Sequence, residues 1–250
     1  PFLHSLQGVW FLEKVEKGGR GLNLSLQVLD GILCHDGESH LARLAPEGEK
    51  TFAHLEEEMR RKLADPQLPL KPMTLEGCVV RLADTISYIG RDLEDAITLN
   101  LVRREELPAV VTQRLGRTNG AIVYSLVADL ISHSFEKNYV GYSPEVGQAL
   151  KALKAFNYER IYNNPLIKSE TSKIETLFAF MFDRFVEDVR ERHLDSPIWR
   201  DYLSTMDVVY LENQQPPEIV RDFIASMTDA YFLRQSEELF FPQPLPWRFA

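Results

Sequence analysis

The sequence predicts a mainly α-helical, globular protein. Segments with apolar residues at helical spacing alternate with short groups of Pro, Gly and Asn, whereas runs that alternate apolar and polar residues are almost absent. Of the 250 residues, 44% are hydrophobic and 26% are charged, which is enough to bury a core in one large domain or two small ones. We therefore expect an all-α fold.

The first half of the chain contains clear helix boundaries. Gly18-Gly19 should end the first helix, Asn23 or Ser25 should start the second, and Thr74 is a good N-cap for the fourth. Three prolines between residues 66 and 72 form a stiff connector before Thr74. The expected helices cover residues 2–16, 23–37, 52–63 and 75–98.

Similar signals divide the second half. Asn119 can cap a helix, and Ser143-Pro144-Glu145 is a strong start signal for the next one. The expected helices run from 119 to 131, from 143 to about 163, from 169 to 193, briefly after Pro197, and from 217 to 239. The character of the sequence changes at Pro165, so we place a boundary there between residues 1–165 and 166–250.

Composition excludes several classes of protein. The formal charge of −9 argues against nucleic acid as the main ligand, because such binding needs an excess of Lys and Arg. Cys34 and Cys78 lack the spacing of a zinc site or a disulfide framework. No apolar run approaches a membrane span, and no secretory signal starts the sequence. We expect a cytoplasmic protein that does not enter a membrane.

The helix over residues 75–98 has the most informative polar face. One side carries an apolar stripe, while Asp84, Tyr88 and Asp92 recur every four residues on another side. This face can be an ordinary solvated surface. Alternatively it lines a pocket, where Asp84 would hold a divalent metal through its hard, anionic oxygen.

A second polar group lies on the helix that starts at Ser143. Lys151, Lys154, Tyr158 and Tyr162 fall on one side of it. Lysines attract phosphate by charge and tyrosine rings pack on a sugar or base, so the group suits a nucleotide. Lysines that extend beside half-buried tyrosines would give the same pattern without any ligand.

Residues 82–96, LADTISYIGRDLEDA, resemble a segment of the dGTP triphosphohydrolases of the HD superfamily that reads roughly ADxIAYxxxDLxDA. The resemblance implies a helical HD-domain-like fold. It assigns Asp84 as the last metal ligand, Tyr88 as a triphosphate contact and Asp92 as the acceptor of the deoxyribose 3′-hydroxyl. Residues 156–165 resemble the family's FLYERVYxxP, which brings Lys154 to phosphate and Tyr162 to the sugar, with Tyr158 and Asn163 nearby. Residues 220–231 extend the likeness as a packing helix.

The start of the chain resembles the family's FxHNxQ. The matching residues include His4, which the resemblance implies is a catalytic acid, and Gln7, which it places at the substrate. A lone His in an apolar helix can equally be a core residue. The adjacent pair His35-Asp36 imitates the HD signature, but we reject it as the metal site because the family's pair lies upstream of FxHNxQ.

The resemblance implies a metal-dependent hydrolase that converts a deoxynucleoside triphosphate to deoxynucleoside and tripolyphosphate. The metal would be Mn, Mg, Fe or Ni, and homo-oligomers are expected. Because the upstream His and HD ligands are missing and the chain begins at Pro1 without Met, we expect a carboxy-terminal piece that is inactive alone. In this interpretation residues 1–165 belong to an HD-like catalytic core on which residues 166–250 pack. The alternatives are an inactive HD-like module that binds nucleotides for regulation and a structural helical adaptor.

Overall fold

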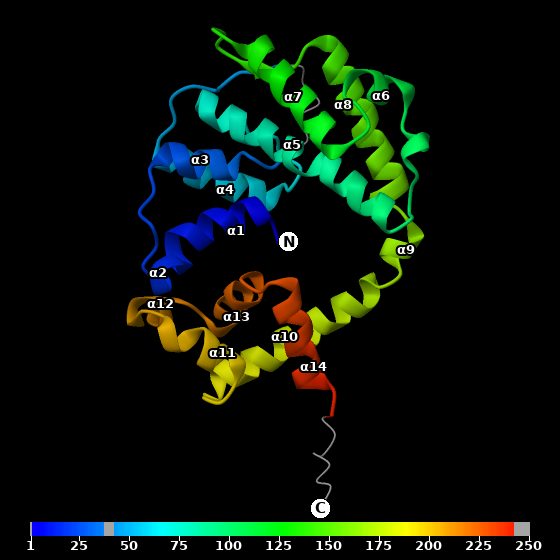
Figure 1. Ribbon diagram of the computed structural model, residues 1–250. Coiled ribbons are helices and arrows are strands. Elements are labelled where there is room, and N and C mark those ends of the chain that lie inside the picture. Colours follow the sequence, from blue (N-terminus) through cyan, green and yellow to red (C-terminus); the bar gives the residue numbers. More distant parts are fainter. Residues whose placement is uncertain (1, 38–42, 243–250) are drawn as a thin grey trace, which may run out of the picture. The chain divides into compact units, whose positions relative to one another are not determined.

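The computed structural model describes residues 2–37 and 43–242 and confirms the all-α prediction. The two strands in the described ranges are β1 (Arg43–Leu44) and β2 (Val140–Gly141), which pair antiparallel with Arg43 opposite Gly141. Everything else that is regular is helical (Figure 1). The chain forms two compact units, which we describe separately.

Unit 1 comprises residues 1–10 and 23–168. Its α-helices are α1 (His4–Trp10), α3 (Leu26–Leu33), α4 (Phe52–Ala64), α5 (Leu75–Thr98), α6 (Ala109–Arg114), α7 (Asn119–Ser134), α8 (Pro144–Asn157) and α9 (Pro165–Lys168). A 3₁₀ turn, η2 (Arg104–Glu106), precedes α6, and a π-helical turn, η3 (Tyr158–Tyr162), continues α8. Unit 1 therefore holds every residue to which the sequence assigns chemistry.

The centre of unit 1 is α5. Thr74 caps it as expected, since its hydroxyl accepts a hydrogen bond from the Gly77 amide at 3.1 Å. Its predicted apolar stripe is buried, as the low exposed fractions of its five side chains show: Leu82, Ile86, Ile89, Leu93 and Ala96. The stripe packs against α7 and α8. Gly90 allows the close approach of α7, because a Cβ atom there would lie 2.6 Å from Asn119 Oδ1. Because the stripe is buried, only the other face of α5 can contact solvent or a ligand.

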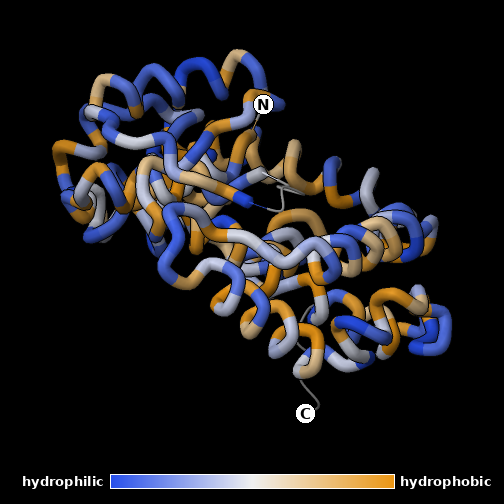
Figure 2. Tube along the Cα trace, turned by 90° about the horizontal axis from the view of Figure 1, so that it is seen from above, coloured by the Kyte–Doolittle hydropathy of each residue, from blue (hydrophilic) through white to orange (hydrophobic). Residues whose placement is uncertain are grey.

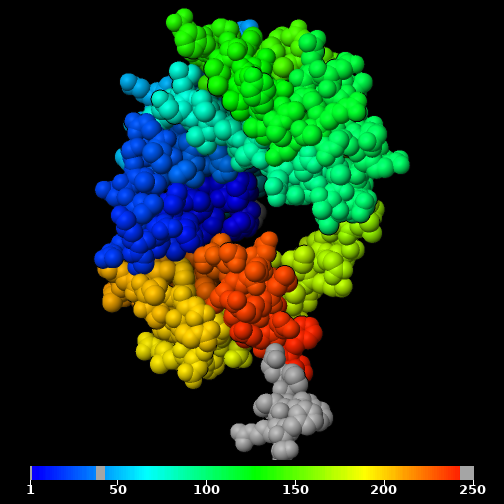
Figure 3. All heavy atoms as spheres, viewed as in Figure 1, coloured from blue at the N-terminus to red at the C-terminus, as the bar shows by residue number. Residues whose placement is uncertain are grey.

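A smaller core lies on the other side of α5. It contains buried side chains from α1, α3 and α4 and from the connector before α5: Val9, Leu29, Leu33, Cys34, Leu55 and Leu70. In Figure 3 the dark blue atoms of α1 adjoin the lighter blue atoms of α3, the two helices of this core that contact each other. Each fully buried leucine contributes roughly 1.5–3 kcal/mol to folding.

Unit 2 comprises residues 11–22 and 169–250. Its elements are η1 (Phe11–Val15, a π-helical turn), α2 (Glu16–Gly19), α10 (Thr171–Arg190), α11 (Pro197–Asp201), η4 (Leu203–Thr205, a 3₁₀ turn), α12 (Val208–Asn213), α13 (Pro216–Ala225) and α14 (Asp229–Phe240). The segment of residues 11–22 is held within this unit by a hydrogen bond from the Asp207 amide to Gly18 O at 2.7 Å. No sequence pattern predicted that residues 11–22 join the second half of the chain.

Several predicted boundaries were wrong for local reasons. The helix expected over residues 2–16 is α-helical only to Trp10, where a π-helical turn follows. The helix expected over 217–239 is two helices, because the Thr228 hydroxyl accepts a hydrogen bond from the Tyr231 amide and caps α14. Thr118, rather than Asn119, caps α7 by accepting from the Ala121 amide.

Apolar and polar residues alternate along the helices, as the hydropathy colours of Figure 2 show. In the described ranges, no helix combines the length and the apolar character that crossing a membrane requires.

Candidate functional site

A pocket of about 310 Å³ lies in unit 1 between α5, α8 and η3. Five residues that the sequence assigned to nucleotide binding line it together, although α5 ends at Thr98 and η3 begins only at Tyr158. Its lining consists of Tyr88, Ile89, Lys151, Lys154, Ala155, Tyr158 and Tyr162. The structure thus brings the whole second polar group together with Tyr88 of the first, so that lysine and tyrosine side chains surround a concave surface.

Asp92 and Tyr162 are hydrogen-bonded beside this pocket. The Tyr162 hydroxyl donates to Asp92 Oδ2 at 2.5 Å, which joins α5 to η3. Burial, followed by this hydrogen bond, raises the pKa of Tyr162 above its ordinary value of 10.0. The phenol therefore stays protonated, and one carboxylate oxygen of Asp92 is held in a fixed direction.

Asn157, the last residue of α8, supports the same corner. Its side chain is fully buried, and its Nδ2 donates to Ile89 O at 2.9 Å, which ties the end of α8 to α5. Its Oδ1 is buried without a hydrogen-bond partner. We did not identify Asn157 from the sequence, although it is the residue that directly precedes Tyr158 in the FLYERVYxxP-like segment.

The two lysines of the pocket differ in exposure. Lys151 is exposed, whereas Lys154, one turn later on α8, is 8% exposed and donates from Nζ to Thr85 Oγ1 at 3.3 Å. Thr85 is the residue after Asp84, and no role was predicted for it from the sequence. An ammonium group at so buried a position is desolvated, so it interacts strongly with any anion that enters the pocket.

The remaining predicted residues lie outside the pocket lining. Asp84 is exposed on α5, outside the buried stripe of the helix. His4 is exposed on α1 and Gln7 is half-buried there, while Asn163 is exposed just after η3. Their roles as catalytic, substrate-binding and metal-binding residues stay predictions.

His4 contacts the histidine that the sequence analysis rejected. The ring centroids of His4 and His35 are 5.0 Å apart. The helices α1 and α3 pack closely, since a Cβ atom on Gly8 would lie 3.4 Å from the Ile32 side chain. His4 precedes Gly8 by one helical turn and His35 follows Ile32 by about one turn, so the two rings meet at the ends of this contact. His35 Nδ1 lies 2.5 Å from Ile32 O, which fixes the proton on that nitrogen.

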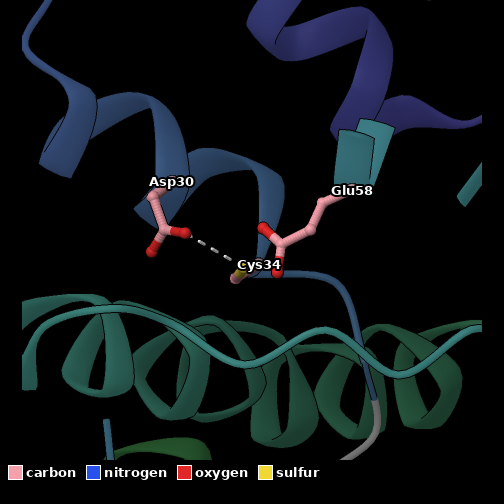
Figure 4. Close-up of side chains that lie close together, drawn as sticks. All are labelled: Asp30, Cys34 and Glu58. Carbon is pink, nitrogen blue, oxygen red and sulfur yellow. Dashed lines mark hydrogen bonds between the residues drawn. The ribbon is translucent and has the colours of Figure 1, made fainter. Parts of the chain in front are cut away.

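One group of three side chains in residues 2–37 and 43–242 has the spacing of metal ligands: Asp30, Cys34 and Glu58. Figure 4 shows Asp30 and Glu58 directed towards the Cys34 sulfur from separate helices. Lys50 already serves this cluster, because its Nζ donates to Asp30 Oδ1 at 2.7 Å and to both oxygens of Glu58 at 2.9 Å. An ammonium thus takes the position that a cation would need, and the cluster does not fit a metal.

Asp84 belongs to no such group within the described ranges. A single exposed carboxylate cannot hold a transition metal tightly. The described residues therefore do not complete a metal site at Asp84, and we assign no chemical step to a metal.

Comparison with known proteins finds relatives that resemble this chain along almost its whole length. Residues 140–238 match the phosphohydrolase-associated domain, a range that starts at β2 and includes α8 and η3. The chain is 30% identical, over 97% of its length and 59% of the relative's, to a deoxyguanosinetriphosphate triphosphohydrolase-like protein of Caldanaerobacter subterraneus subsp. tengcongensis. Proteins of the same name from Desulfatibacillum aliphaticivorans and Clostridium tetani are each 28% identical, over 98% and 97% of the chain and over 63% and 60% of their own lengths.

The chain thus spans about three fifths of the length of the curated relatives it matches. The motifs around Asp84 and the pocket residues of α8 and η3 both lie within the shared region. The chain is thus similar to the deoxyguanosinetriphosphate triphosphohydrolase-like proteins, and its residues 140–238 match the phosphohydrolase-associated domain.

Proposed function

We propose that this chain binds deoxynucleoside triphosphates in the pocket between α5, α8 and η3, as part of an enzyme that hydrolyses them. The observation that carries the proposal is the convergence of two lysines, three tyrosines and the Asp92–Tyr162 pair on one concave surface. Cations suit the triphosphate, rings suit the sugar and base, and a fixed carboxylate suits a hydroxyl.

The lysines and Tyr88 form the phosphate side. Lys154 supplies a buried ammonium and Lys151, one turn earlier, an exposed one, so an incoming triphosphate meets charge before it reaches the buried group. Tyr88 stands on α5 opposite them in the same lining. Its hydroxyl can donate to a phosphate oxygen, and its ring limits the width of the pocket.

Asp92 and Tyr162 form the sugar side. Asp92 Oδ2 accepts from Tyr162, and a carboxylate has capacity for about four hydrogen bonds, so Asp92 can also accept one from the 3′-hydroxyl of the sugar. The Tyr158 ring, which is 64% exposed, can lie against the base or sugar at the pocket entrance.

The reaction that fits the family is hydrolysis at the α-phosphorus. Water adds to phosphorus, the bond to the sugar 5′-oxygen breaks, and a proton passes to that oxygen, which yields deoxynucleoside and tripolyphosphate. His4 is the proposed acid, and Asp84 is the proposed protein ligand of a divalent metal such as Mn, Mg, Fe or Ni. The other ligands would have to lie outside the described residues. Homo-oligomers and a cytoplasmic location remain part of this proposal.

One observation favours a second candidate, a module that binds nucleotides for regulation without cleaving them. The pocket is well formed, whereas Asp84 lacks converging ligands in the described ranges. Such a module would keep affinity for the triphosphate and lack turnover.

The test compares binding with cleavage. Residues 1–250 should bind dGTP in calorimetry, and Lys154→Met or Tyr162→Phe should weaken that binding, while Lys137→Met on the surface should not. A form extended by the preceding residues that the resemblance implies should release tripolyphosphate, detected by phosphorus NMR. Binding without release in both forms favours the regulatory module. Equal binding by the wild type and Lys154→Met sinks the assignment of the pocket.

A further inference from the structure

The hydroxyl of Thr85 has an unusual position on α5. Thr85 lies on the buried stripe of the helix, between Leu82 and Ile89, and is 8% exposed. An apolar residue of the same shape would pack there equally well, and burying a hydroxyl costs free energy unless it is hydrogen-bonded. The sequence thus keeps a polar atom at a position where packing does not require one.

The other serine and threonine hydroxyls of α5 bond within their own helix. Ser87 donates to Asp84 O at 2.6 Å and Thr98 donates to Glu94 O at 2.9 Å, both at exposed positions. Thr85 Oγ1 instead accepts a hydrogen bond from Lys154 Nζ, which reaches it from α8, 69 positions along the chain. Thr85 therefore connects the phosphate side of the pocket to the helix that bears Asp84 and Tyr88.

We infer that Thr85 is a positioning residue that holds the Lys154 ammonium in the direction in which it meets a polyphosphate; this inference rests on the proposed function. A free lysine side chain must lose rotamer freedom when it binds an anion, and that loss weakens binding. The bond to Thr85 imposes the restriction during folding, so Lys154 is ordered before the ligand arrives. Lys151 is exposed, so it contributes charge but its side chain is not ordered in this way before the ligand binds.

The experiment separates the hydroxyl from the shape of the side chain. Thr85→Val keeps the branched shape and removes the acceptor, Thr85→Ser keeps the acceptor, and Thr98→Val is the matched control on the same helix. Two quantities are measured in residues 1–250: the acetylation rate of Lys154 relative to Lys151, by mass spectrometry at limiting reagent, and the Kd for inorganic tripolyphosphate, by calorimetry. Lys154→Met identifies the binding that belongs to this pocket.

Thr85→Val should make Lys154 react faster and should weaken tripolyphosphate binding by about two- to tenfold, the cost of ordering one long side chain. Thr85→Ser and Thr98→Val should match the wild type in both measurements. An unchanged Lys154 rate or an unchanged Kd in Thr85→Val, with normal binding by the wild type, overturns the role of Thr85 alone. If the wild type binds no tripolyphosphate, or binds it equally well as Lys154→Met, the phosphate site of the proposed function is wrong and the Thr85 inference falls with it.

Discussion

Lys50 and Lys154 are both nearly buried lysines of unit 1, and their surroundings are opposite. The Lys50 ammonium bonds the carboxylates of Asp30 and Glu58 and the carbonyl of Lys71, at 2.7 to 2.9 Å. Lys154 donates to a neutral hydroxyl and lines a pocket. A lysine has three protons to donate, and at Lys50 three groups accept them. Carboxylate partners thus mark Lys50 as a structural lysine, whereas its position in a pocket lining marks Lys154 as one that can serve a ligand.

The largest effect expected from this difference is on stability. Lys50→Met leaves the fully buried Asp30 carboxylate and Glu58 without their cation, and breaking a buried pair in this way costs about 3–5 kcal/mol of unfolding free energy. Lys154→Met replaces a desolvated ammonium by an apolar chain and should cost no more than about 1 kcal/mol. Urea unfolding of both variants, with Lys137→Met as the surface control, measures the contrast. Equal losses for Lys50 and Lys154 would remove the distinction between them.

A second effect concerns the thiol at the Lys50 cluster. Burial, followed by the nearby Asp30 carboxylate, raises the pKa of Cys34 from 9.0 to about 12. Since the thiolate is the reactive form, its fraction at pH 8 falls by a factor of about 1,000, and burial slows access further. In a Cys78→Ala background, a disulfide reagent should therefore label Cys34 at least about 1,000 times more slowly in the native protein than in denaturant. Rapid native labelling would show that the cluster opens readily.

Local patterns explain how much of this fold the sequence predicts. The cap at Thr74 and the buried stripe of α5 follow from spacing within one helix, and both are confirmed. A π-helical turn such as η1 or η3 leaves no such signature, so the first helix was predicted too long. The short helices α6 and α12 have too few turns to show a period, and we did not predict them.

The site required information beyond spacing. Periodicity placed Asp92 and Tyr162 on polar faces of two helices, but only the family resemblance indicated that residues 70 positions apart meet. The partners of the site were missed, because Thr85 looks like one more residue of a buried stripe and Asn157 like a helix end. Lys50 was also missed, because its contacts to Asp30 and Lys71 depend on how α3 packs against the connector before α5.

A third effect concerns Asp92, which is expected to bind the 3′-hydroxyl of the ligand. In a form that cleaves nucleotides, Asp92→Asn should reduce the preference for dGTP over its 2′,3′-dideoxy analogue by about tenfold in kcat/KM, because a neutral amide accepts a hydrogen bond less strongly than a carboxylate. Asp95→Asn, three residues further on the exposed face of α5, is the matched control and should leave the ratio unchanged. Equal preference in wild type and Asp92→Asn would show that the carboxylate does not meet the 3′-hydroxyl.

The smallest effect should come from Tyr162→Phe, which removes one hydroxyl from the sugar side and keeps the ring. The lost hydrogen bond to Asp92 should cost about 1–2 kcal/mol of unfolding free energy near pH 7, while Tyr158→Phe at the exposed end of η3 should cost almost nothing. The contribution of Tyr162 to the unfolding free energy should also change with pH in a defined direction. Because folding raises the pKa of Tyr162, its contribution is fully present below the ordinary tyrosine pKa of 10.0 and is lost as the pH rises towards the higher folded value. The difference in stability between wild type and Tyr162→Phe should therefore be constant from pH 7 to 9 and shrink above pH 10, measured by urea unfolding at each pH. A difference that grows in that range would mean that the folded protein stabilises the phenolate of Tyr162 rather than the phenol.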